Sequence, residues 1–229
     1  MPNELPPRKA ETMTIAATRT HVALPARTLL VCGAVSGPLY FLTTLTQAAV
    51  RDGFDLTKHP ASMLSNGDAG WIQVTNFLLT GVLMIAGAIG LSRTLEPGIG
   101  STWGPRLLGV FGASLLFAAV FKADPGNGFP AGSGPGTIST AGVLHMAAGS
   151  VGFLSLIVAT FVLASRFSRE GRRGWAVYSR ATGIAFFASF AGISSGNANA
   201  VVMLAFWATV MLAWGWVTAV VVHTARSAR

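Results

Sequence analysis

Residues 55–71, DLTKHPASMLSNGDAGW, form a polar stretch between two long apolar runs. The runs on either side, residues 28–50 and 71–91, are each about as long as the roughly 20 apolar residues that cross a bilayer as a helix. The polar stretch therefore predicts a loop that joins two membrane-spanning helices at one face of the membrane.

Composition extends this prediction to the whole chain. Hydrophobic residues make up 52% of the 229 residues and charged residues only 10%, against roughly 25% charged residues in soluble domains. Further apolar runs follow at residues 107–123, 140–165, 181–198 and 201–222. We therefore expect an all-α integral membrane protein, with a six-helix transmembrane bundle over residues 28–225. Residues 1–27 mix proline, threonine and basic residues, which is typical of a mobile tail.

The distribution of charge predicts the orientation of the bundle. The formal net charge is +8, but the basic residues alternate with apolar runs and form no single nucleic-acid-binding face. Thirteen of the sixteen Lys and Arg residues fall in the terminal segments and in the connections 92–106 and 166–180. Because cytoplasmic loops are enriched in basic residues, both termini are expected in the cytoplasm. Membrane lipid is the expected partner, no nucleic acid is expected, and no cofactor or oligomeric state is indicated.

The predicted spans carry almost no charge in their middles. A proton-coupled transporter normally needs a titratable side chain at depth, so the sequence disfavours active transport. Passive transport would need a continuous polar path through the helices, which the apolar third and sixth runs also disfavour.

Reactive side chains gather instead in the segments expected outside the cytoplasm. They come from the first outer loop, the end of the third run, the start of the fourth run and the last outer loop. We expect them to converge on a site that binds a lipid or small amphiphile. These binding candidates are Asp55, Lys58, His59, Asp124, His145 and Asn197.

A short helix is expected to begin at Pro60 and to stop at residues 66–67, with its free N–H groups toward Lys58 and His59, which would suit an anion such as a lipid phosphate. Two other interpretations fit the same residues. In the first, Asp55, Lys58 and His59 only fix the loop through turn bonds. In the second, the protein is a membrane-embedded hydrolase. His145 would then be its base, Asp124 the partner of that base and Ser62 the nucleophile.

A metal-dependent form of the hydrolase would use His59, His145 and Asp124 as ligands. No pair of histidines has the short spacing that is typical of zinc sites. The metal ligands would therefore have to come from separate segments of the chain.

Four blocks of sequence resemble a bacterial membrane family described as domain of unknown function 998. They are GFDLTKHPASMLSNGDAGWIQVTNFLLTG at 53–81, FKADPGNGFP at 121–130, GVLHMAAGSVGF at 142–153 and RGWAVYSRATGIAFFASFAGISSG at 173–196. The resemblance covers residues 28–224 and implies a six-helix protein of the bacterial cytoplasmic (inner) membrane. It also implies that Asp124, Pro125 and His145 belong to the family pattern, but it implies no activity.

Overall fold

The computed structural model describes residues 24–196 and 199–227. Within these residues the chain forms six long helices, one short 3-10 helix and no strand. All six long helices are long and apolar enough to cross a membrane. The all-α prediction is therefore confirmed, and the protein is a multi-pass membrane protein. The elements are α1 (Ala26–Val50), η1 (Ala61–Ser65), α2 (Gly70–Thr94), α3 (Trp103–Val120), α4 (Thr140–Arg169), α5 (Arg173–Ser194) and α6 (Ala200–Ser227).

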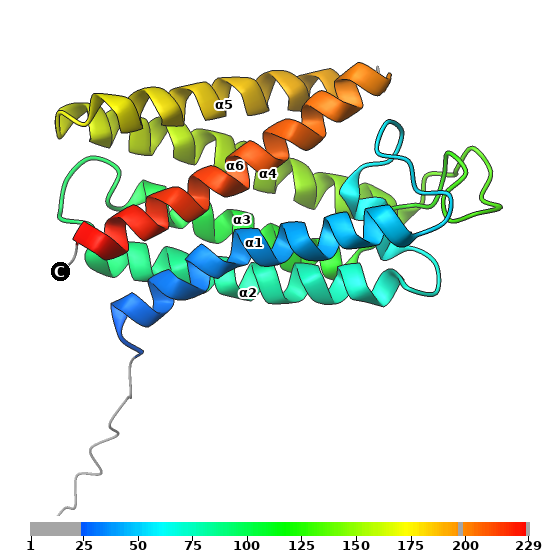
Figure 1. The fold of residues 1–229 in the computed structure, drawn as a ribbon, viewed down its shortest axis with the longest axis horizontal. Coiled ribbons are helices and arrows are strands. Elements are labelled where there is room, and N and C mark those ends of the chain that lie inside the picture. Colours follow the sequence, from blue (N-terminus) through cyan, green and yellow to red (C-terminus); the bar gives the residue numbers. More distant parts are fainter. Residues whose placement is uncertain (1–23, 197–198, 228–229) are drawn as a thin grey trace, which may run out of the picture.

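The six helices form a closed ring. Consecutive helices pack side by side, and α6 returns to pack against α1 (Figure 1). Consecutive helices run in opposite directions, so residues 51–69 and 121–139 lie at the same end of the bundle as the end of α5 and the start of α6 (Figure 1). We call this the distal end. The start of α1 and the end of α6 lie at the opposite, proximal end.

Glycines allow α1 and α2 to approach closely. A Cβ added to Gly33 would lie 2.7 Å from the Cα of Gly87, so neither position has room for a side chain. Nearer the distal end the same helices are joined by a buried amide pair, in which Gln47 Nε2 donates to Gln73 Oε1 at 2.8 Å. Because a bilayer offers no water to such groups, this bond is made within the bundle, although Gln47 Oε1 has no hydrogen-bond partner among the described residues.

All six helices differ from their predicted bounds at one or both ends, and two of the differences bear on the site. The third helix ends at Val120 instead of residue 123, because Phe121 is already extended, and Asp124 therefore belongs to the following loop. The fifth helix begins at Arg173 instead of residue 181 and ends at Ser194 instead of residue 198. Hydropathy marks the part of a helix that lies in hydrocarbon, and the polar first turns of α5 continue beyond that part.

The predicted tail, residues 1–27, mostly falls outside the described residues. The structure describes the chain from Leu24, and α1 already begins at Ala26. The mobility of the tail stays a prediction.

Candidate binding site

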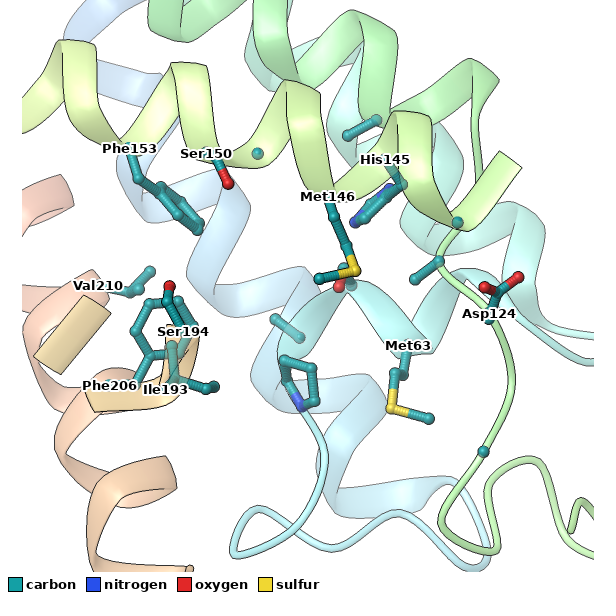
Figure 2. Close-up of a pocket in the computed structure, with 18 of the residues that line it drawn as sticks. Met63, Asp124, His145, Met146, Ser150, Phe153, Ile193, Ser194, Phe206 and Val210 are labelled. Carbon is teal, nitrogen blue, oxygen red and sulfur yellow. The ribbon is translucent and has the colours of Figure 1, made fainter. Parts of the chain in front are cut away.

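A cavity of about 490 Å³ lies inside the distal half of the bundle. All six long helices contribute to its walls, and η1 together with residues 124–138 covers its distal side. Figure 2 shows His145, Met146 and Phe153 on α4, with Phe206 and Val210 of α6 on the other side of the space. Pockets for small ligands usually measure roughly 300–1,000 Å³ and are mostly apolar. The size and lining of this cavity match such a pocket.

Aromatic rings line the proximal side of the cavity. The ring of Phe153 lies 5.6 Å from that of Phe190 and 5.6 Å from that of Phe206 between centroids. On the other wall, the rings of Phe111 and Trp214 are 5.1 Å apart. Among the described residues, no lining residue lies near the proximal end of the bundle. The cavity therefore does not run through to that end, a geometry that suits binding better than passage.

His145 borders the cavity from the second turn of α4. Its side chain is buried, and its Nδ1 lies 2.7 Å from the backbone carbonyl oxygen of Phe121, at the end of α3. Because a carbonyl oxygen only accepts hydrogen bonds, Nδ1 must carry the hydrogen. In the neutral ring, Nε2 is then an acceptor. The imidazole thus joins α3 to α4 and can accept a hydrogen bond from a hydroxyl group.

Asp124 also borders the cavity, but its carboxylate is bound to the start of α4. It accepts hydrogen bonds from the backbone N–H of Ser139 at 2.9 Å and from the Ser139 hydroxyl at 2.5 Å. These bonds lower the pKa of Asp124, so the group is ionised at neutral pH. A Cβ on Gly142 would collide with this carboxylate. Among the described residues, the hydrogen-bond partner of Asp124 is Ser139 and not His145.

Asp55 and Lys58 lie on the surface of the first distal loop. The Asp55 carboxylate accepts hydrogen bonds from the Thr57 backbone N–H at 2.8 Å and from the Thr57 hydroxyl at 2.6 Å, and it pairs with Lys58 Nζ at 3.2 Å. The Thr57 hydrogen bonds, with a smaller effect of Lys58, lower the pKa of Asp55 to about 2. Neither side chain lines the cavity. Their contacts match the interpretation in which they fix the loop.

His59 has a structural position in the same loop. It is 1% exposed, its Nδ1 accepts from the Asp55 backbone N–H at 2.9 Å, and its Nε2–H donates to the carbonyl oxygen of Asn127 at 3.0 Å. Trp207 Nε1 on α6 donates to the His59 carbonyl oxygen at 3.1 Å. Both ring nitrogens are therefore used, and the residue ties the first distal loop to residue 127 and to α6.

The remaining predicted site residues are Ser62 and Asn197. Ser62 lines the cavity, while Asn197 lies outside the described residues. Over residues 24–196 and 199–227, no group of three or more His, Cys, Asp or Glu side chains is placed to hold a metal ion. The structure thus brings Ser62, Asp124 and His145 to one cavity but does not gather the three metal candidates His59, His145 and Asp124.

Arg51 organises the cover of the cavity, a role that sequence reasoning missed. Its Nη1 donates to the Leu64 carbonyl oxygen and its Nη2 to the Asn66 carbonyl oxygen, both at 2.6 Å. The guanidinium also lies 4.8 Å from the centroid of the Phe129 ring. Asn66 Nδ2 then donates to the Ala123 carbonyl oxygen at 2.9 Å. The two distal loops are therefore joined above the cavity. The short helix η1 follows Pro60, as predicted.

The apolar lining was also missed by the sequence analysis. Met146, Phe206 and Val210 lie in apolar runs, where nothing in the sequence separates a lipid-facing residue from one that faces a cavity. A glycine within a span removes side-chain volume, but the same run also holds Gly152, which packs closely against Ser114, so the sequence did not single out Gly149. A Cβ there would meet no heavy atom within 4 Å.

The comparisons with known proteins identify a family and nothing more specific. A family model described as protein of unknown function (DUF998) matches residues 34–223. No curated protein and no solved structure matches the chain.

Proposed function

Because this chain belongs to the DUF998 family, whose description carries no activity, we propose its function from its cavity: it binds the apolar chain of a membrane lipid or small amphiphile. The observation that carries the proposal is the 490 Å³ cavity, which does not run through to the proximal end and is lined largely by aromatic and aliphatic side chains. Close packing of the chain against these side chains favours such binding.

The polar groups of the lining support a ligand with an uncharged head. The Ser62 and Ser150 side chains and the imidazole of His145 border the space, and Asp124 is already bound to Ser139. With no Lys or Arg among the described lining residues, the cavity offers no positive partner for an anionic group. A hydroxyl or ester group suits these neutral donors and acceptors.

The proposal includes an orientation in which the cavity faces away from the cytoplasm. Among the described residues, nine Lys and Arg lie toward the proximal end and three, Arg51, Lys58 and Lys122, toward the distal end. This asymmetry supports cytoplasmic termini. We place the protein in the bacterial cytoplasmic membrane, with the cavity in the outer leaflet.

The experiment uses Gly149→Leu to fill the cavity. The purified protein in nanodiscs is titrated with a fluorescent long-chain fatty alcohol, and Gly215→Leu serves as the matched control. Both glycines lie within a span, and a Cβ at either position meets no heavy atom within 4 Å, but only Gly149 lines the cavity. We expect Gly149→Leu to weaken saturable binding at least tenfold and Gly215→Leu to leave it unchanged. Equal binding by all three proteins would refute the proposal.

A hydrolase is the second candidate, because Ser62, Asp124 and His145 all line the same cavity. The geometry supports it less well, since Asp124 is bound to Ser139 and His145 donates from Nδ1 to Phe121. A long-chain nitrophenyl ester tests it. Hydrolysis that is lost in both Ser62→Ala and His145→Ala would favour the enzyme, and hydrolysis unchanged by these substitutions would remove it.

A further inference from the structure

We infer that the ligand enters the cavity sideways from the bilayer, between α4 and the distal end of α5, so that the ligand is a lipid-borne chain. The inference rests on the proposed function and adds the route and the source of the ligand. We call the gap bordered by Met146 on α4 and by Ile193 and Ser194 on α5 the side opening.

The first observation is that residues of the side opening line the cavity and are also exposed. Met146 lines the cavity, yet 68% of its surface is accessible. Ser194 also lines the cavity and is exposed. A side chain can have both properties only where the cavity reaches the outside of the bundle. Figure 2 shows Met146 separated from Ile193 and Ser194 by the open space.

The second observation is that α4 and α5 pack closely near Gly183 but less closely near Gly149, toward the distal end. A Cβ on Gly183 of α5 would collide with the Thr160 hydroxyl and would lie 2.9 Å from the Phe161 ring. Nearer the distal end, a Cβ on Gly149 of α4 meets no heavy atom within 4 Å. Figure 1 shows the distal ends of α5 and α6 diverging from the start of α4. The two helices thus separate toward the distal end.

The third observation is that hydrogen-bonded segments lie over part of the cavity on the side toward water, where Pro135, Thr137 and Ile138 also line the cavity and are exposed. Residues 60–63 and 124–127 lie over the cavity. They are held by the hydrogen bonds from Asn66 to Ala123 and from His59 to Asn127. Trp207 of α6 also donates a hydrogen bond to the His59 carbonyl oxygen. Opening this cover would break several buried hydrogen bonds, whereas the side opening needs no such change.

The depth of the side opening indicates the occupant. Met146 lies six residues after Thr140, the first residue of α4, which is about 9 Å along the helix axis at 1.5 Å per residue. At that level a membrane-spanning helix faces lipid chains rather than water. An acyl or alkyl chain already in the bilayer can enter the cavity there.

The test closes the side opening with a covalent cross-link. Cys32, the one cysteine of the chain, is first replaced in Cys32→Ala. Met146→Cys and Ile193→Cys are then introduced, and a short bismaleimide links the two new cysteines. The control pair, Phe161→Cys and Ile184→Cys, lies at the level where α4 and α5 already pack closely. Transfer of a pyrene-labelled fatty alcohol from the nanodisc lipid into the cavity is followed by stopped-flow fluorescence.

We expect the cross-link at the side opening to slow transfer at least tenfold and the control cross-link to change it less than twofold. If the first cross-link leaves transfer unchanged while Gly149→Leu still abolishes binding, the entry route is wrong and the cavity function stands. If Gly149→Leu leaves binding intact, the proposed function fails and this inference fails with it.

A single substitution gives an independent readout if the double variant does not fold. Met146→Cys in the Cys32→Ala background carries an environment-sensitive fluorophore in nanodiscs. Quenching by lipids with brominated chains, and not by aqueous iodide, is the expected result. The reverse pattern would place the opening in water and overturn the inference.

Discussion

His145 of α4 donates a hydrogen bond from Nδ1 to the backbone carbonyl oxygen of Phe121, 2.7 Å away, at the end of α3. The bond fixes the tautomer of the ring and closes the cavity wall where α3 leaves the membrane. A residue that sequence reasoning offered as a base or metal ligand is therefore also a link between two helices.

Replacing His145 with alanine should destabilise the protein, because the Phe121 carbonyl oxygen loses its side-chain partner. We expect a loss of about 1–3 kcal/mol in the free energy of unfolding, measured by thermal unfolding in a mild detergent. Val143→Ala, an exposed position two residues earlier on the same helix, is the control and should change little. Equal stability of the two variants would contradict a structural role for His145.

Replacing Arg51 with lysine should destabilise the folded protein, although the positive charge is kept. Lysine cannot reproduce the two hydrogen bonds to the Leu64 and Asn66 carbonyl oxygens together with the contact of the planar guanidinium on Phe129. We expect a loss of about 1–2 kcal/mol in the free energy of unfolding and faster proteolysis within residues 51–69. In Lys58→Arg the partly exposed pair with Asp55 is retained, and stability should change by less than about 0.5 kcal/mol.

The Asp124 carboxylate should make the start of α4 sensitive to acid. Because Ser139 lowers its pKa, the ionised form stabilises the folded state. That contribution is complete above the ordinary pKa of about 3.9 and disappears as the pH falls through the lower pKa of the folded protein. Hydrogen exchange at the first turn of α4 should increase over that range. In Asp124→Asn the exchange should already be fast at neutral pH and should show no such step.

Adding a side chain at Gly33 should separate α1 from α2. The backbone of Gly87 occupies the space a Cβ would need, so Gly33→Leu should cost about 1–3 kcal/mol in the free energy of unfolding. Gly215→Leu adds the same volume at a position with nothing within 4 Å and should be tolerated. The midpoints of thermal unfolding of the two variants give the comparison. A Gly33→Leu variant as stable as the wild type would show that the helices can repack.

Several features of the fold could be predicted because they depend on local composition. Six apolar runs fixed the number of helices, since each long run needs a helix to satisfy its backbone in a bilayer. Pro60 and the stop at residues 66–67 correctly predicted the short helix η1. The bounds of α5 were missed because its polar first turns, from Arg173, continue the helix outside the hydrophobic window.

The candidate site could be predicted only in part. Ser62, Asp124 and His145 do line one cavity, as expected if polar residues of the distal end converge. His59 does not, because its ring nitrogens are bound by the backbone of Asp55 and Asn127. Sequence spacing cannot reveal such partners, since the atoms that satisfy a loop side chain come from elsewhere in the chain.

The sequence alone therefore determined that the chain crosses a membrane as an all-helical bundle, because burial of apolar runs in lipid depends on composition and length. Only the tertiary structure decided where those helices leave space. The cavity lies toward the distal end, where α4 and α5, in close contact at Gly183, diverge. That separation follows from side chains packed between distant segments, which no single run of sequence encodes.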